Sequence, residues 1–195
     1  MNKLIVASNN KHKIIEIKEM LVDFDIEILS LEEANINLDV EETGTSFKEN
    51  ALLKAKAIYQ IVQIPVLSDD SGLEVEALAN EPGIYSARYA GLDKDDKANN
   101  EKLLTKMKNQ KHRSARYVCA MALVIDNKTI HCVEDYLYGE IIDEYRGTNG
   151  FGYDPLFYLK DLDKTLAQIS LEEKNRLSHR YKALKKIYNI IKELV

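Results

Sequence analysis

The amino-acid sequence predicts an α/β fold built on a mixed β-sheet. The first half of the chain alternates apolar strand-like runs with helix-like segments, which is typical of parallel strands joined by helices. The second half holds consecutive strand-like runs with short turns, which favours an antiparallel section. At 195 residues the chain can bury a sizeable core, and it shows no repeat or interdomain linker. We therefore expect one domain spanning residues 1–195.

Composition restricts the classes of function. The net charge of −5, from 32 acidic and 27 basic residues, argues against a nucleic-acid-binding protein but permits a local basic site for a small anion. We expect no membrane association, because no apolar run approaches a membrane span and the N-terminus leads straight into a strand. Two cysteines make neither a disulfide framework nor a metal cluster, and Cys119 lies in an apolar segment. A buried reduced thiol there indicates the cytoplasm.

The chain begins with a strand over residues 3–8, a short polar loop and a helix that carries Ile17 on its apolar face. A strand–loop–helix arrangement places backbone N–H groups and a helix N-terminus where an anion can bind. The side chains that add donors or positive charge here are Ser8, Asn10, Lys11 and Lys13. A plain helix cap with solvated lysines is the alternative interpretation.

An acidic loop over residues 39–44 precedes a helix predicted over residues 46–62. This helix starts with the capping-box spacing Ser46-x-x-Glu49, and its apolar residues recur at helical spacing. Asn50 and Lys54 fall on or beside the inward face. A lysine there either extends to solvent along its aliphatic stem or reaches a functional anion.

The stretch from Pro65 to Val75 places Asp69 and Asp70 at the end of an apolar run, followed by Ser71-Gly72. This pattern predicts a strand, a tight turn at the glycine and a second strand. Adjacent carboxylates repel each other unless a cation or proton lies between them, and oxygen-only clusters suit Mg²⁺. An ordinary acidic turn is the alternative.

The middle of the chain contains a loop-rich segment over residues 80–91 and a polar helix over residues 94–108. Aliphatic and β-branched runs predict further strands. These strands are expected over residues 25–31, 115–125, 129–133 and 136–142. We expect His131 to be a structural member of the sheet.

Residues 147–157 contain three glycines, two aromatic residues before the final Phe157, and Asp154 before a proline, which predicts neither a helix nor a regular strand. Glycines let a backbone approach a ligand closely, and an exposed aromatic ring offers a stacking surface for a flat ring. This density of special residues favours a binding loop over a plain loop.

The chain ends with a second capping-box start at Ser170 and a terminal helix that opens with Ser178-His179-Arg180. Cations at a helix N-terminus oppose the helix dipole. A functional reason for His179 and Arg180 is therefore indicated.

Together these stretches resemble the inosine/xanthosine triphosphate pyrophosphatase family, which removes deaminated purine nucleotides from the nucleotide pool. The motifs that carry the resemblance are Ser8-x-Asn10-x-x-Lys13, Asp69-Asp70-Ser71-Gly72-Leu73, Pro82-Gly83-Ile84-Tyr85-Ser86-Ala87-Arg88, Gly150-Phe151-Gly152-Tyr153-Asp154-Pro155 and Lys174 with Ser178-His179-Arg180. They occur in the family's order across nearly the whole chain. The first motif departs slightly, with Ser8-Asn9 in place of the Thr-Gly common in bacterial relatives.

The resemblance implies a long twisted mixed sheet flanked by helices, in two lobes with a central cleft. It implies a single nucleoside triphosphate pyrophosphatase domain and a cytoplasmic homodimer. The implied reaction is hydrolysis of ITP, dITP or XTP between the α- and β-phosphates, which gives the monophosphate and pyrophosphate.

The resemblance also implies roles for individual residues. Asp70 is implied as the general base and, with a glutamate of the Glu41-Glu42 pair, as a ligand of Mg²⁺; of the pair, Glu41 is the expected ligand. The residues implied to bind the substrate are Ser8, Asn9, Asn10, Lys11, His12, Lys13, Lys54, Ser71, Phe151, Gly152, Tyr153, Asp154, Lys174, His179 and Arg180. Phe151 is implied to stack on the purine.

Selectivity is expected from a donor on Arg180 or His179 that bonds the oxygen hypoxanthine and xanthine carry where adenine has an amino group. Three other functions stay open: a pyrophosphatase of the same fold acting on pyrimidine or modified nucleotides, a nucleotide-binding sensor without turnover, and a phosphatase that releases the terminal phosphate.

Overall fold

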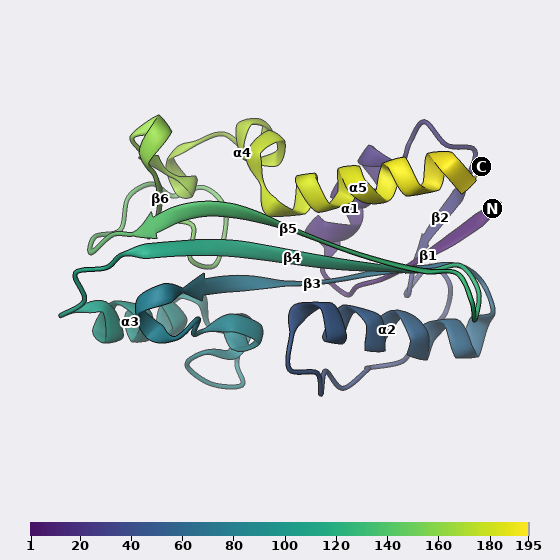
Figure 1. Ribbon diagram of the computed structural model, residues 1–195, viewed down its shortest axis with the longest axis horizontal. Helices are drawn as coiled ribbons and strands as arrows, with labels where there is room; N and C mark the ends of the chain where they lie inside the picture. The colour runs from purple at the N-terminus through teal and green to yellow at the C-terminus, as the bar shows by residue number, and fades with distance from the viewer. Residues whose placement is uncertain (195) are drawn as a thin grey trace. The chain divides into compact units, whose positions relative to one another are not determined.

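The structure is a computed structural model that describes residues 1–194 except for the side chain of His12, so the predicted role of His12 lies outside the described part. A seven-stranded sheet has the order β2-β1-β3-β4-β5-β6-β7 (Figure 1). The strands are β1 Lys3–Ala7, β2 Glu27–Ser30, β3 Val66–Val75, β4 Ser114–Val124, β5 Ile130–Ile141, β6 Phe157–Leu159 and β7 Lys164–Thr165. The α-helices are α1 Lys11–Met20, α2 Phe47–Val62, α3 Asp96–Met107, α4 Leu171–Leu177 and α5 His179–Leu194.

The sheet is mixed, as the sequence predicts. β1 pairs in parallel with β2 on one side and β3 on the other, whereas β6 pairs antiparallel with β5 and with β7. The parallel strands are joined through α1 and α2, whereas β5 is joined to β6 by the loop over residues 142–156 and β6 to β7 by a short connection.

The chain forms two compact units. The first unit comprises Met1–Asp70, Cys119–Asp135 and Lys182–Val195, and the second comprises Ser71–Val118 and Tyr136–Tyr181. The predicted single domain and the central cleft stay predictions. No described helix is both long and apolar enough to span a lipid bilayer.

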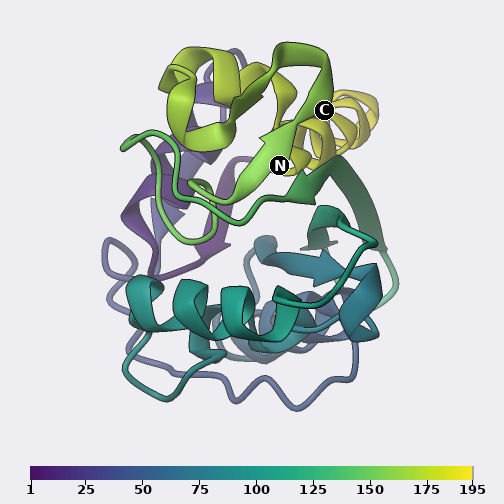
Figure 2. The same ribbon diagram turned by 90° about the vertical axis from the view of Figure 1, so that its left-hand side faces the viewer.

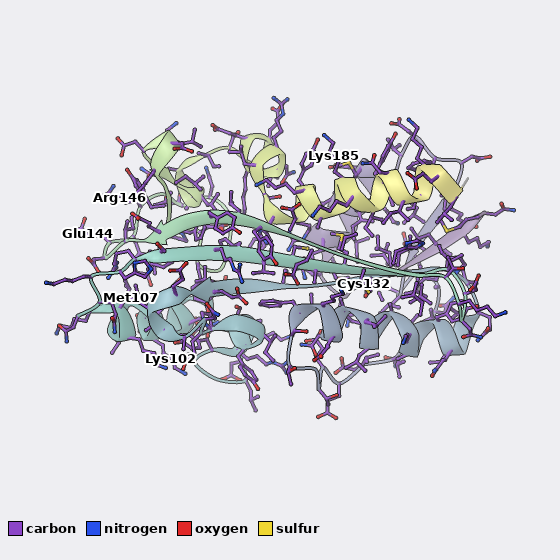
Figure 3. All side chains as sticks on the ribbon, viewed as in Figure 1. Lys102, Met107, Cys132, Glu144, Arg146 and Lys185 are labelled. Atoms are coloured by element: carbon purple, nitrogen blue, oxygen red, sulfur yellow. The ribbon has the colours of Figure 1, made fainter. Side chains whose placement is uncertain are left out.

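In the first unit, helices cover both faces of the strands (Figure 1). α1 and α5 pack on one face, where Ile17 and Leu184 meet Leu67, while α2 packs on the other, where Ala51 meets Ile5. Cys119 is fully buried on β4, as predicted, and Cys132 on β5 is partly exposed (Figure 3). Because strand side chains alternate between faces, adjacent residues of β3 meet different helices.

The second unit has its own core. Leu73 and Tyr117 from the strands pack with Leu103 and Met107 of α3, which is shown in teal in Figure 2. Tyr153 and Phe157 from the predicted binding loop join the same cluster. The loop is therefore anchored to a packed interior at its C-terminal end.

Two strand predictions are wrong in detail. β3 runs through Gly72 as one strand from Val66 to Val75, without the predicted turn, and β5 joins two predicted strands into one. The carboxylates of Asp69 and Asp70 are tolerated within β3 because each has a partner on a helix. Local strand propensity does not report such long-range partners.

The predicted start of α2 is confirmed. Ser46 is its N-cap, and its hydroxyl accepts a hydrogen bond from the backbone N–H of Glu49 at 3.2 Å. The Glu49 carboxylate accepts from the backbone N–H and hydroxyl of Thr45, one residue before the cap. These bonds satisfy donors at the exposed end of the helix that carries Asn50 and Lys54.

We predict that Ser46→Ala lowers the free energy of unfolding by about 1 kcal/mol, because it removes the N-cap acceptor of α2. Urea unfolding followed by circular dichroism measures this loss. Lys48→Ala, an exposed change in the same helical turn, is the control. Equal stability of the two variants would contradict a capping role for Ser46.

Candidate functional site

The loop between β1 and α1 is held by its own polar side chains. The hydroxyl of Ser8 accepts from the backbone N–H of Asn10 at 3.2 Å, and the Asn10 side chain accepts from the N–H of Lys13 at 3.3 Å. Asn9 and Lys11 are exposed. The loop presents polar side chains beside the N-terminus of a ten-residue helix, which suits an anion.

Asp69 lies on the α1 side of β3 and is almost completely buried, with 1% of its surface exposed. The ammonium of Lys13 lies 2.7 Å from its Oδ2 atom. A buried carboxylate is costly without such a partner. Lys13 is thereby fixed close to the end of β1.

Asp70 lies on the α2 side of the same strand and accepts a hydrogen bond from Asn50 Nδ2 at 3.1 Å. Asn50 is 1% exposed, and its Oδ1 accepts from the backbone N–H of Gly44 at 2.8 Å. A Cβ on Gly44 would lie 2.7 Å from that Oδ1 atom, so glycine is required there. Asn50 thus ties the acidic loop to Asp70. The sequence placed Asn50 on the inward face without a functional role.

Lys54 forms an ion pair with Glu42, with Nζ and Oε1 2.5 Å apart. Burial acts to lower the pKa of Lys54, but Glu42, Asp69 and Asp70 outweigh it and raise the pKa. The ammonium is therefore held by carboxylates within the first unit and does not simply extend to solvent. Glu41, the predicted metal ligand, is exposed.

Glu42, Asp69 and Asp70, with Lys13, Lys54 and Asn50, are here called the carboxylate cluster. Burial and the negative charge of Glu42 raise the pKa of Asp70 to about 6, against the opposing effects of Asn50 and the two lysines. The nearby charges of Asp70 and Glu42 favour a proton or a bound cation. Carboxylate oxygens are the ligands that Mg²⁺ prefers, but among the described residues no three metal-ligating side chains lie together in a way that could hold an ion.

Asp154 organises the predicted binding loop in the second unit. It is 2% exposed, and its Oδ2 atom accepts from Lys174 Nζ at 2.5 Å and from the backbone N–H of Phe151 at 3.0 Å. Its Oδ1 atom accepts from the hydroxyl of Tyr117 at 3.3 Å. A Cβ on Gly150 would lie 2.0 Å from Oδ2, and the φ of Gly150 is +75°, so this position requires glycine.

Phe151 is the exposed aromatic residue of this loop, with 48% of its surface accessible. The ammonium of Lys174 lies 4.6 Å from the centre of its ring. Tyr153, in contrast, is buried, and its hydroxyl donates to the backbone oxygen of Ser86 at 2.7 Å. The side chain of Tyr153 therefore anchors the loop to the core of the second unit, whereas the Phe151 side chain is half exposed. Gly152 lies between them, with its backbone bonded to α3.

His179 and Arg180, at the start of α5, are buried in spite of their polarity. The ring of His179 stacks on Tyr117, with ring centres 4.9 Å apart and planes 8° from parallel. A guanidinium nitrogen of Arg180 lies 3.3 Å from the hydroxyl of Ser71. We call Tyr117, Phe151, Asp154, Lys174 and His179 the Asp154 cluster. Tyr117 was not among the residues that the sequence analysis predicted for the site.

The second unit also contains a polar hollow of about 410 Å³. Its charged lining residues are Lys108, Arg113, Glu140, Asp143, Glu144 and Arg146. The charges of these three cations and three carboxylates cancel. None of the predicted site residues lines the hollow. Two of its lining residues, Glu144 and Arg146, are labelled in Figure 3. The two clusters above therefore remain the candidate sites.

The raised pKa of Asp70 predicts a pH-dependent cost to stability. Folded Asp70 holds its proton up to about pH 6, whereas its ordinary pKa is 3.8, so folding becomes less favourable as pH rises through this window. Asp70→Asn should stabilise the metal-free protein at pH 8 by about 1–3 kcal/mol, and should change nothing below pH 4.

Thermal unfolding of both proteins in chelator at pH 8 and pH 3.5 measures this effect. Asp126→Asn is the control, because backbone N–H groups of Lys128 and Thr129 lower the pKa of Asp126, so this change should not stabilise the protein at pH 8. A variant at position 70 that is no more stable than wild type at pH 8 would contradict the electrostatic account.

Comparison with known proteins agrees with the fold. A model of the Ham1 family matches residues 4–190. Relatives named dITP/XTP pyrophosphatase are 46% identical in Clostridium perfringens, over 100% of both chains, and 45% identical in Bacillus subtilis, over 98% of both. The solved structure of the Staphylococcus aureus Ham1 protein matches with a TM-score of 0.94 and 43% identity, covering 100% of both chains. The resemblance deduced from the five motifs is thereby confirmed: the chain belongs to the Ham1 family.

Proposed function

We propose that this protein hydrolyses deaminated purine nucleoside triphosphates, namely dITP, ITP and XTP, to the monophosphate and pyrophosphate. The observation that carries the proposal is Asp70, a largely buried carboxylate whose pKa is raised to about 6 beside two lysines. A general base works best with a pKa near the working pH, and this value leaves Asp70 deprotonated at neutral pH. The names of the Clostridium perfringens and Bacillus subtilis relatives support the choice of substrate.

The carboxylate cluster takes the phosphate chain in this proposal. Lys13 and Lys54 are held by Asp69 and Glu42, and both can bond phosphate oxygens while keeping these partners, since an ammonium has three donors. The side chains of Ser8 and Asn10 add polar contacts. Asp70 accepts the proton of the attacking water, and the lysines stabilise the charge that develops on the leaving pyrophosphate.

In this proposal Asp70 of the carboxylate cluster also takes part in binding Mg²⁺. The combined negative charge that raises the pKa of Asp70 is relieved by a cation, and the ligands offered are the oxygens that Mg²⁺ prefers. Asp70 and Glu41 would hold the ion, because Glu42 is already paired with Lys54. When bound, Mg²⁺ neutralises phosphate charge and lowers the pKa of a coordinated water.

The Asp154 cluster takes the base. Phe151 offers its exposed face for stacking, while His179 and Arg180 supply donors for the oxygen at the six-position of the purine ring. Lys174 and Asp154 hold the loop that carries Phe151. We also propose that the protein works as a homodimer in the cytoplasm, and that it binds neither nucleic acid nor membranes.

Product analysis tests the proposal. Incubation with ITP and Mg²⁺ should yield IMP and pyrophosphate in equal amounts, and Asp70→Asn should lower kcat by at least ~10³-fold because base and metal contributions are both lost. Orthophosphate with IDP would identify a phosphatase, and binding without turnover would identify a sensor. Preferred turnover of pyrimidine triphosphates would favour a pyrophosphatase of the same fold with another substrate.

We predict that activity needs added Mg²⁺ and increases toward alkaline pH, because the attacking water must lose its proton. In a titration of Mg²⁺ against rate, Glu41→Gln should raise the concentration for half-maximal activity by about tenfold, the effect of losing one carboxylate contact. Glu42→Gln is the matched control at the neighbouring position. It should change activity mainly by removing the ion pair with Lys54, and should change the Mg²⁺ requirement less. Full activity in excess chelator would remove the metal from the mechanism, and a larger effect at Glu42 would reassign the ligand.

We predict that Arg180→Ala costs about 1–3 kcal/mol in kcat/KM for ITP, the value of one good base contact. ATP lacks the acceptor oxygen, so its kcat/KM should fall much less and the ITP/ATP ratio should collapse. Both substrates are measured on both proteins at fixed Mg²⁺. Lys182→Ala, a change of another cation in the same helix, is the control. Equal losses for ITP and ATP would show that Arg180 supports phosphate binding or the fold.

A further inference from the structure

Tyr117 links two residues of the Asp154 cluster that are far apart in the chain. It lies on β4 with 9% of its surface exposed, and its ring lies parallel to that of His179 at a centre-to-centre distance of 4.9 Å. Phe157 contacts the same ring at 4.7 Å in a tilted arrangement, 47° from parallel. The imidazole of His179 is therefore stacked on a ring that is itself fixed by the core.

The hydroxyl of Tyr117 contacts the second of these two residues, Asp154. It donates to Asp154 Oδ1, while Oδ2 of the same carboxylate receives the ammonium of Lys174 and the backbone N–H of Phe151. With donors on both oxygens, the carboxylate cannot rotate without losing a bond. Burial and the charge of Asp154 raise the pKa of Tyr117, so the phenol keeps its proton and remains a donor.

We propose that Tyr117 is a positioning residue for base recognition, which sets the plane of the His179 imidazole and the orientation of the Asp154 carboxylate. The inference rests on the proposed function and assigns it a specificity determinant that does not itself touch the substrate. If the His179 imidazole keeps its plane, the N–H at its edge points in a fixed direction toward the base. If the Asp154 carboxylate keeps its orientation, Lys174 and Phe151 keep their positions relative to the base. The ligand class is a purine that carries an oxygen at the six-position.

A purely structural role is the competing explanation, because Tyr117 also belongs to the hydrophobic core of the second unit. The two roles differ in what Tyr117→Phe changes. Phenylalanine preserves the stack and the packing volume but removes the bond to Asp154. A core role affects stability alone, whereas a positioning role also changes the preference between ITP and ATP.

Tyr89→Phe supplies a matched control. Tyr89 lies in the same unit, is 7% exposed, and donates its hydroxyl to Glu81 Oε2 at 2.9 Å. Each variant thus removes one hydrogen bond from a buried phenol to a carboxylate. None of the residues placed in the carboxylate cluster or the Asp154 cluster contacts the Tyr89 hydroxyl through a described hydrogen bond.

For Tyr117→Phe, KM for ITP should rise about 3–10-fold, the effect of losing one hydrogen bond, with kcat within about twofold of wild type. KM for ATP should stay within about twofold, so the ITP/ATP ratio of kcat/KM falls about 3–10-fold. Tyr117→Leu, which also loses the stack, should lower the ratio further while the folded content by circular dichroism is retained. Tyr89→Phe should leave the ratio unchanged.

The outcomes separate this inference from the function on which it rests. Wild type that produces no IMP and pyrophosphate from ITP overturns both. Wild-type turnover combined with an unchanged ITP/ATP ratio in Tyr117→Phe, or with a similar fall in Tyr89→Phe, overturns the role of Tyr117 alone. If Tyr117→Leu does not fold, Tyr117→Phe decides the matter by itself.

Discussion

The burial of two adjacent carboxylates in β3 is the constraint on which the candidate site depends. Side chains alternate along a strand, so Asp69 and Asp70 face opposite sides of the sheet. Each needs a polar partner on its own side, and these partners come from different helices: Lys13 on α1 and Asn50 on α2. The flanking helices therefore do more than cover apolar strands, because each brings a polar side chain to a fixed place beside the acidic pair.

The burial of this acidic pair accounts both for the basicity of Asp70 and for a loss of folding stability. A direct ion pair between Asp70 and a lysine would lower the pKa of Asp70 and weaken it as a general base. Asn50 donates a neutral hydrogen bond instead, while burial and Glu42 keep the pKa high. Deprotonation of Asp70 above pH 6 therefore lowers the stability of the folded protein. Such local instability is common where a protein maintains a reactive group.

The sequence predicted most elements of the fold and most residues of the candidate site, because both leave local signals. Helical periodicity and the cap at Ser46 located α2, and the density of glycine and aromatic residues located the Phe151 loop. The turn expected at Gly72 is wrong because the propensity of Asp69 and Asp70 is overridden by partners distant in the chain. The sequence predicted no functional role for Asn50 or Tyr117, because their partners are also distant in the chain.

Tyr117 shows most clearly what the sequence alone cannot predict. In the sequence it is one aromatic residue in an apolar strand, and such a residue predicts only a core position. Its partners, Asp154 and His179, follow 37 and 62 residues later. Only the packing of β4 against α5 and the binding loop brings the three together, and periodicity within a segment contains no information about that packing.

The two clusters also divide binding from discrimination. Every nucleoside triphosphate carries the same phosphate chain, so in the proposed mode of binding contacts from Lys13 and Lys54 would stabilise ITP and ATP alike. Discrimination must come from groups that meet the base, and there a buried donor without its acceptor is penalised. Such a penalty requires rigid groups, since a mobile donor would turn to another acceptor. The fixed carboxylate of Asp154 and the stacked ring of His179 provide that rigidity. In the proposed mechanism, the charged groups of the carboxylate cluster serve catalysis, and the fixed groups of the Asp154 cluster serve selectivity.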